Sequence, residues 1–132
     1  MLSILLIEDD EDVQLFIQKP LQHLGIHVDV TDNVCDALGL FKQRHYDLII
    51  TDIILADKSG VELIRNFKAR NPDIKIIAIS GGAPDLAQAF NLPTAAALNN
   101  LNSAKSAGAD IALAKPFKTS ELIEQVVSLI AA

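Results

Sequence analysis

Short apolar runs alternate along the chain with segments in which apolar residues recur every three or four positions. A run such as IKIIAIS is almost continuously aliphatic, which is typical of a strand buried on both faces of a parallel sheet. The periodic segments are typical of helices with one apolar face. The pattern therefore predicts five strands, at residues 2–7, 26–30, 47–51, 74–79 and 111–114.

Strands and helices alternate five times, so the sequence predicts an α/β domain of the (βα)5 type with helices on both faces of the sheet. The last helix follows Thr119 and Ser120, which suit an N-cap, and has Glu121 in its first turn. The apolar positions that indicate the first three helices are Val13, Phe16, Ile17, Leu21 and Leu24, then Val34, Ala37, Leu38 and Phe41, then Val61, Ile64 and Phe67.

Two segments depart from this simple scheme. Pro20 falls inside the first helical pattern and lacks the donor for a bond to the Phe16 carbonyl, so we expect a kink there. The second departure is an inserted segment between the fourth strand and the fourth helix: about 30 residues separate the last two strands, where a helix and two loops need about 16–24. We expect an extra short helix between Pro84 and Pro93 in this segment, followed by a regular helix that ends at Gly108.

The 132 residues suit one domain, with no output domain expected beyond the last helix. No apolar run approaches the ~18 residues of a membrane span, and the segment MLSILLIED lacks the basic residues typical of a signal peptide, so we expect a cytoplasmic protein without membrane insertion. The single cysteine, Cys35, is interpreted as a small core residue. The net charge is −6, with 17 acidic and 11 scattered basic residues, which argues against direct nucleic-acid binding and favours protein partners or a cation.

The residues that could bind a ligand or take part in a reaction lie at the carboxyl ends of the predicted strands. Glu8 and Asp9 follow the first strand, and Asp52, Ser80 and Lys115 end the third, fourth and fifth. In a doubly wound, flavodoxin-like sheet with strand order 2-1-3-4-5, the first and third strands are neighbours at the switch point where ligands bind. We therefore expect the three carboxylates to share one pocket.

Such a pocket has to bind a cation or take up protons, since two like charges ~4 Å apart repel by ~4 kcal/mol at a surface-like dielectric. Mg²⁺ suits carboxylates combined with a phosphate, so the cluster indicates phosphoryl chemistry. Asp52 is the predicted nucleophile, with Lys115 neutralising and Ser80 hydrogen-bonding the phosphoryl oxygens. Gly81, after Ser80, leaves room for that group.

At these residues the chain resembles the response regulator receiver domain of two-component signalling, in its single-domain form. The resemblance covers essentially the whole chain. It rests on ILLIEDD with the acidic pair, DLIITD with Gly60 eight residues after Asp52, IIAIS with the hydroxyl residue, and AKPF with the lysine. The remaining acids of the first run, Asp10, Glu11 and Asp12, match no ligand position and are expected to start the first helix.

The resemblance implies that Asp52 accepts a phosphoryl group from the phosphohistidine of a sensor histidine kinase. It implies direct Mg²⁺ ligands in Asp9, Asp52 and the Ile54 carbonyl, with Glu8 acting through water. Ser80, Gly81 and Lys115 would surround the phosphoryl group, and the bond before Pro116 would be cis. The domain would catalyse only its own phosphorylation and slow dephosphorylation, and would switch the binding of a downstream protein target.

Two residues differ from the usual pattern of the family. Ala112 stands where an aromatic residue normally couples to the hydroxyl residue, and Ala56 stands where proline is frequent. Two alternative functions remain open: a phosphorelay intermediate that passes the group to a histidine phosphotransfer protein, and an unphosphorylated pseudo-receiver that only binds partners. A flavodoxin-like cofactor protein is disfavoured by the acids after the first strand, and an aspartate phosphatase by Ile54 where a second acid is expected.

Overall fold

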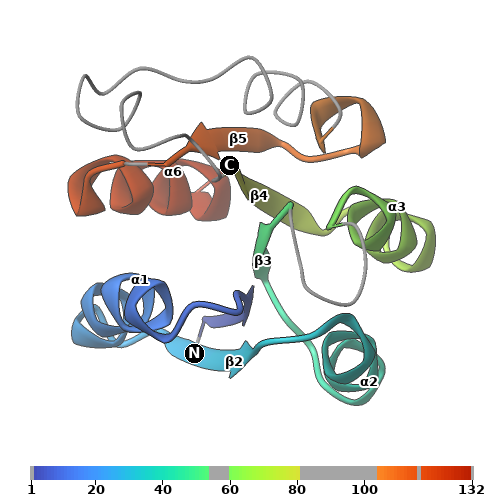
Figure 1. Cartoon of the computed structure of the whole chain (residues 1–132), viewed down its shortest axis with the longest axis horizontal. Coiled ribbons are helices and arrows are strands. Elements are labelled where there is room, and N and C mark those ends of the chain that lie inside the picture. Colours follow the sequence, from blue (N-terminus) through green and yellow to red (C-terminus); the bar gives the residue numbers. More distant parts are fainter. Residues whose placement is uncertain (1, 54–59, 81–103, 116, 132) are drawn as a thin grey trace.

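The computed structural model describes residues 2–53, 60–80, 104–115 and 117–131. Its centre is a five-stranded parallel sheet of order β2-β1-β3-β4-β5, which confirms the predicted topology (Figure 1). The strands are β1 (Ser3–Ile7), β2 (His27–Thr31), β3 (Leu48–Asp52), β4 (Lys75–Ser80) and β5 (Ile111–Ala114). Each lies within one residue of its predicted range at both ends.

Helices cover both faces of the sheet. They are α1 (Glu11–His23), α2 (Val34–Gln43), α3 (Gly60–Arg70) and α6 (Thr119–Ala131). Helices α1 and α6 lie on one face, and α2 and α3 lie on the other (Figure 1). Residues 104–107 form a helical turn that packs on the α2 and α3 side through Ala104. The doubly wound arrangement is therefore as predicted.

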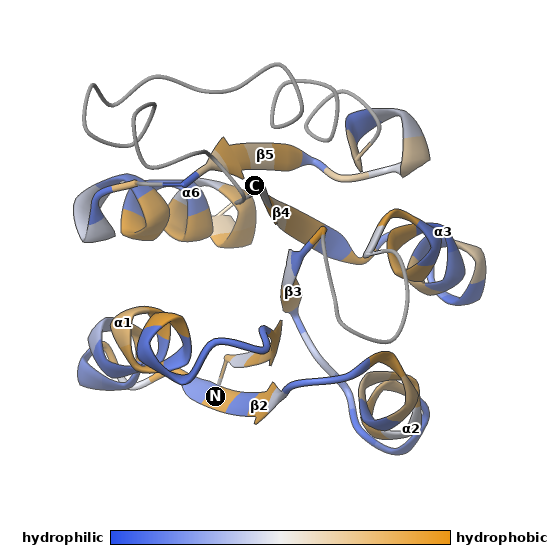
Figure 2. Cartoon of the chain, viewed as in Figure 1, coloured by the Kyte–Doolittle hydropathy of each residue, from blue (hydrophilic) through white to orange (hydrophobic). Residues whose placement is uncertain are grey.

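The core consists of two apolar layers that share the sheet. Along β1, Leu5 and Ile7 contribute to the layer under α2 and α3, while Ile4 and Leu6 contribute to the layer under α1 and α6. This alternation explains why the central strands are aliphatic at almost every position, since helices cover both of their faces, whereas the edge strand β2 carries the exposed His27. Figure 2 shows strongly apolar colouring along β5 and much of β4, polar segments in β2, and helices that are apolar on one side and polar on the other.

Side-chain caps begin the first two helices. The Asp10 carboxylate accepts hydrogen bonds from the N–H groups of Asp12 at 2.9 Å and Val13 at 3.4 Å, and Asn33 caps α2 by accepting from Asp36 at 2.8 Å. The predicted role of the acids after Asp9 as a helix start is confirmed. Helix α1 continues through Pro20 to His23, and the kink stays a prediction.

The position of Cys35 differs from the prediction that it is a small core residue. The thiol is exposed, not part of the core. Its neighbours Val34 and Ala37 are buried against the sheet, and successive helical residues are about 100° apart, so Cys35 points away from the face that they define. An apolar helix pattern therefore located the helix but not the orientation of this residue.

Part of the inserted segment lies outside the described residues. Its Pro84 and Pro93, and the extra short helix predicted between them, cannot be compared with the structure. The end of the segment is described: the helical turn at residues 104–107 is followed by Gly108 at φ +125°, a conformation that favours glycine. The predicted helix end at Gly108 is confirmed.

Candidate acidic site at the carboxyl ends of the strands

The sheet topology brings three carboxylates together. Glu8 follows β1, Asp52 is the last residue of β3, and these two strands are paired neighbours. One oxygen from each of Glu8, Asp9 and Asp52 lies within 4.8 Å of the others, so the three side chains could hold one cation. The cluster predicted from the strand ends is therefore present.

A lysine from the opposite edge of the sheet reaches this cluster. Lys115 directly follows β5, which is separated from β1 by β3 and β4. Its Nζ lies 3.0 Å from Asp52 Oδ2 and 3.2 Å from Glu8 Oε2. These contacts join residues 63 and 107 positions apart in the sequence, and they place a positive charge beside the predicted nucleophile.

The two carboxylates that contact Lys115 are nearly removed from water. Glu8 is 1% exposed and Asp52 is 5% exposed, whereas Asp9 lies at the surface. Burial, reinforced by the charge of Asp52 and opposed by that of Lys115, raises the pKa of Glu8 to about 7. Burial by itself lowers the pKa of Lys115, but the charges of Asp52 and Glu8 outweigh burial and raise it. Lys115 is therefore charged at neutral pH.

Backbone contacts hold the loop between β1 and α1. The Glu8 N–H donates to the Thr31 carbonyl at the end of β2, at 3.0 Å, and the Gln14 side-chain amide donates to the Glu8 carbonyl at 2.6 Å. The Asp10 N–H donates to a Glu8 carboxylate oxygen at 3.2 Å. Gln14 was not predicted from the sequence. A helical pattern does not show whether the side chain of a glutamine near the helix start contacts the backbone or only solvent.

The backbone at Asp52 is equally constrained. The buried Thr51 hydroxyl donates to the Asp52 carbonyl at 3.0 Å. The Gly60 N–H donates to the Ile53 carbonyl at 2.7 Å, and a Cβ on Gly60 would lie 2.2 Å from the Asp52 carbonyl oxygen. Helix α3 can approach the end of β3 this closely only because residue 60 has no side chain.

Several predicted site residues lie wholly or partly outside the described residues. Ile54, Gly81 and Pro116 are outside them, as is Ala56. Ser80 ends β4 as predicted, where it pairs with Ala114 of β5, but its side chain is not described. The roles of these residues stay predictions. Ala112 is half-buried in β5 beside Ala78 of β4 and packs against the α2 and α3 layer.

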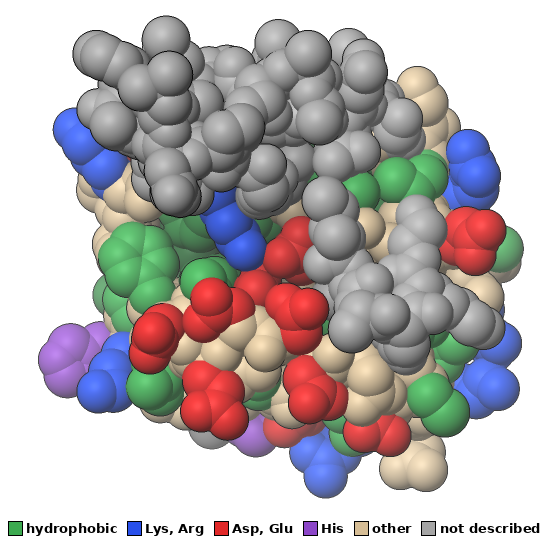
Figure 3. Space-filling model, viewed as in Figure 1, with side chains coloured by type: hydrophobic (Ala, Val, Ile, Leu, Met, Phe, Trp, Pro, Cys, Tyr) green, Lys and Arg blue, Asp and Glu red, His purple; other side chains and the backbone are tan. Residues whose placement is uncertain are grey.

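Acidic side chains gather around this site. The cap Asp10 and the first turn of α1, with Glu11 and Asp12, add charge beside Glu8 and Asp9. Figure 3 shows acidic side chains clustered near the centre of this face, with basic ones mostly toward its margins. Among the described residues, the site combines three carboxylates with one ammonium group, so its net charge favours a hard cation.

Comparison with known proteins identifies this arrangement. The model of the response regulator receiver domain family matches residues 4–127. The chain belongs to that family. The response regulator receiver protein CpdR of Brucella abortus (strain 2308) is 33% identical over 132 residues, which are all of this chain and 99% of CpdR. The transcriptional regulatory protein CusR of Escherichia coli (strain K12) is 29% identical over 129 residues, which are 98% of this chain and only 51% of CusR.

Solved structures agree on the fold. A CheY-like response regulator receiver domain protein from Methanospirillum hungatei JF-1 superposes with a TM-score of 0.84 at 24% identity, covering 99% of this chain and 94% of the other. Receiver domains are signalling modules of two-component systems and not enzymes of the ordinary kind. Among the described residues of this receiver domain, no helix has the length and apolar character needed to cross a bilayer.

Proposed function

We propose that this receiver domain accepts a phosphoryl group on Asp52, with the help of Mg²⁺, from a sensor histidine kinase, and that phosphorylation switches its binding to a downstream protein. The observation that carries the proposal is the contact of 3.0 Å between Lys115 Nζ and Asp52 Oδ2, made beside the carboxylates of Glu8 and Asp9. A carboxylate with an adjacent ammonium group and a potential cation site has the parts that phosphoryl transfer requires.

In the proposed reaction, an Asp52 carboxylate oxygen attacks the phosphorus of a phosphohistidine. The new O–P bond forms as the N–P bond of the donor breaks, and the imidazole leaves with the electron pair and takes up a proton. Lys115 carries a full positive charge at neutral pH, and its Nζ neutralises oxygens of the transferring group. The hydrogen bonds of Thr51 and Gly60 hold the backbone of residues 52 and 53, which fixes the position of the nucleophile.

Glu8, Asp9 and Asp52 fit Mg²⁺ as a group. All three offer oxygen atoms, which hard cations prefer, and the single positive charge of Lys115 beside three carboxylates leaves an excess of negative charge. When bound, Mg²⁺ supplies positive charge for the phosphoryl oxygens. Asp9 is the exposed member of the three and lies at the surface.

The proposed partners are a sensor histidine kinase, or a histidine phosphotransfer protein if the domain acts within a relay. We place the reaction in the cytoplasm, where a reducing environment suits the exposed thiol of Cys35. We do not favour direct contact with nucleic acid, since the net charge is −6.

The test is incubation of the protein with Mg²⁺ and acetyl phosphate, followed by intact-mass measurement. We expect one phosphate adduct, which is absent without Mg²⁺ and absent in Asp52→Asn. Asp36→Asn is the matched control, because it removes an exposed carboxylate of α2 outside the site. Circular dichroism verifies that each variant is folded.

Two results would contradict the proposal. An adduct that persists in folded Asp52→Asn would move the acceptor to another residue. If the folded wild-type protein gains no adduct, even with a phosphorylated histidine kinase as donor, the domain is a pseudo-receiver and the carboxylate cluster serves only binding or structure.

A further inference from the structure

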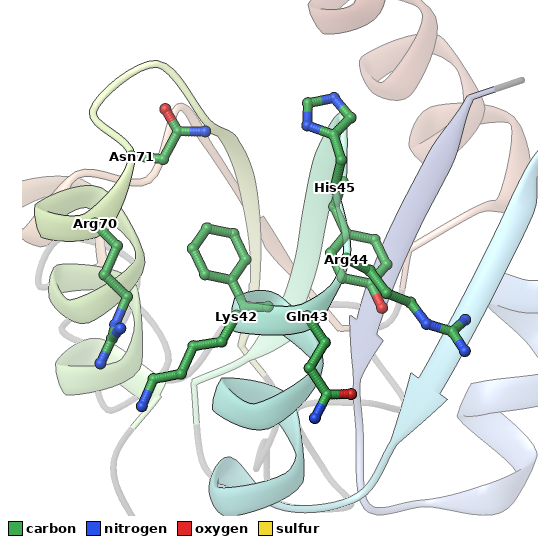
Figure 4. A pocket seen from close by; sticks show the side chains of 8 residues that line it. Lys42, Gln43, Arg44, His45, Arg70 and Asn71 are labelled. Carbon is green, nitrogen blue, oxygen red and sulfur yellow. The ribbon is translucent and has the colours of Figure 1, made fainter.

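A second concave site lies at the opposite end of the molecule from Asp52. It is a cavity of about 580 Å³ between the carboxyl-terminal ends of α2 and α3, and we call it the basal pocket (Figure 4). Its main side chains are Phe41, Lys42, Gln43, His45, Arg70 and Asn71. These residues lead into the amino ends of β3 and β4, whereas the acidic site is built at the carboxyl ends of the strands.

The lining of the basal pocket contains basic, amide and aromatic side chains but no carboxylate. Two basic side chains of the lining have acidic neighbours outside it: Arg44 pairs with Asp29 at 3.1 Å, and His45 lies 3.5 Å from Asp47. Neither Lys42 nor Arg70 takes part in any of the ion pairs found among the described residues. These two exposed cations therefore dominate the charge of the pocket.

The two cations are arranged to act together. In Figure 4, Lys42 and Arg70 extend their charged ends toward the same side of the pocket, and Arg44 extends the other way. Arg70 Nε donates to Asn66 Oδ1 at 3.1 Å, which orients the guanidinium through a group other than its terminal nitrogens. The Phe41 ring packs on Phe67 at a centroid distance of 4.6 Å and forms a fixed apolar wall.

Helix dipoles explain only part of this arrangement. A cation in the last turn of a helix is favourable, and Lys42 and Arg70 both occupy last turns. The dipole also disfavours carboxylates beside these helix ends, but it does not require the two positive charges to border one cavity. In a chain with 17 acidic and 11 basic residues, a pocket bordered by two cations and no carboxylate is complementary to an anionic ligand.

We propose that the basal pocket docks an acidic peptide segment of a protein partner. Lys42 and Arg70 pair with two carboxylates of the segment, the Gln43 and Asn71 amides bind its backbone, and Phe41 contacts an apolar side chain. Electrostatic complementarity of this kind raises the association rate and selects the partner. Nucleic acid fits less well, because two cations give few phosphate contacts and the net charge of −6 repels a polyanion.

The position of the pocket makes docking independent of the acidic site. Parallel strands separate the two sites by the full length of the sheet, so an acidic segment can bind whether or not Asp52 is modified. The unphosphorylated, Mg²⁺-free protein is therefore sufficient for a test, and failure of the proposed phosphorylation would leave this proposal intact.

The experiment is a titration of ¹⁵N-labelled protein with the acetylated peptide Glu-Glu-Phe-Glu-Glu, followed by amide chemical shifts. We expect saturable shifts at Lys42, Gln43, Arg70 and Asn71. Lys42→Glu combined with Arg70→Glu should weaken binding by at least about fivefold. The matched control is Lys19→Glu with Lys118→Glu, which makes the same change of charge at two exposed lysines elsewhere and should leave binding unchanged.

Three results would overturn the proposal. The first is the absence of saturable shifts in the wild-type protein, and the second is equal weakening in the test and control variants. The third is tighter saturation of the same amides by a single-stranded oligonucleotide, which would assign the pocket to nucleic acid. If charge reversal unfolds the protein, Lys42→Ser with Arg70→Ser removes the charges without adding repulsion, and the same loss of binding is expected.

Discussion

Asp29, on the edge strand β2, is held by three polar neighbours. Its carboxylate accepts a hydrogen bond of 2.6 Å from the Tyr46 hydroxyl, and it pairs with Arg44 at 3.1 Å and with His27 at 2.9 Å. Burial by itself raises the pKa of Asp29, but the Tyr46 hydroxyl, His27 and Arg44 together outweigh it and lower the pKa below 3.8. Burial of Tyr46 and its hydrogen bond to Asp29 raise the pKa of Tyr46.

Tyr46→Phe should therefore raise the pKa of Asp29 toward its ordinary value. Because the folded pKa is lowered, the Asp29 contacts stabilise the protein above pH 3.8, and this stability is lost as the pH falls through the lowered pKa. An NMR titration of side-chain carboxyl carbons measures the change, with the other carboxyl groups in the same spectrum as controls. An unchanged Asp29 midpoint would show that the hydroxyl does not determine its pKa.

At the scale of residues, the sequence predicted which groups form the acidic site but not how they are supported. Glu8, Asp9, Asp52 and Lys115 could be found because a strand end places a residue at a known edge of the sheet. Gln14 could not be found in this way, because its contact with the Glu8 carbonyl depends on the exact path of the loop between β1 and α1.

Among the secondary-structure elements, helix α1 allows a test of how Pro20 affects stability. Pro20 lies inside the helix, lacks the N–H that would bond to the Phe16 carbonyl, and crowds the preceding turn. Pro20→Ala should restore that bond and raise the free energy of unfolding by about 1–3 kcal/mol. Urea denaturation measures the change.

Lys19→Ala, at the neighbouring exposed position, is the control for this measurement and should change stability by less than about 0.5 kcal/mol. A Pro20→Ala protein no more stable than the wild type would mean that α1 already satisfies the Phe16 carbonyl by other means.

Elements were predicted more reliably than the orientation of residues within them. The strands were found within one residue, and burial on both faces explains the aliphatic runs of the central ones, whereas the edge strand β2 contains His27 and Asp29 and has no such run. Cys35 was misplaced because a small residue near the start of a helix is compatible with either face, and only the buried positions of Val34 and Ala37 decide it.

On the scale of the whole molecule, Lys115 links the last strand to the first. Removing it by Lys115→Met leaves Glu8 and Asp52 buried together without their ammonium partner, so we expect a loss of about 2–4 kcal/mol in EDTA at pH 8. The loss should be smaller at pH 6, because the pKa of Glu8 is raised to about 7 and the protonated group carries no charge. Mg²⁺ should restore more stability to the variant than to the wild type, since the cation no longer competes with Lys115.

Urea unfolding at both pH values, with EDTA and with Mg²⁺, measures these differences. Lys118→Met removes an exposed charge three residues away and serves as the control, with a change below about 0.5 kcal/mol. Equal stability of Lys115→Met and wild type in EDTA at pH 8 would show that the two carboxylates do not depend on Lys115.

The contact between Lys115 and Glu8 also marks the limit of prediction from sequence. Both residues follow the carboxyl ends of their strands, but β3 and β4 lie between β1 and β5, and only the length and direction of the lysine side chain close that distance. The basal pocket was missed for a related reason: Lys42 and Arg70 belong to different helices, and each alone resembles an ordinary helix end.

The separation of acidic site and basal pocket also determines how the protein will lie on a charged support. An aminated surface attracts the acidic end, so the attached molecule turns its basal pocket toward the solution and hides Asp52. A sulfonated surface favours the reverse orientation. Biosensor measurements of peptide docking and of phosphoryl transfer therefore need opposite attachment chemistries, and a single chip would report one activity and conceal the other.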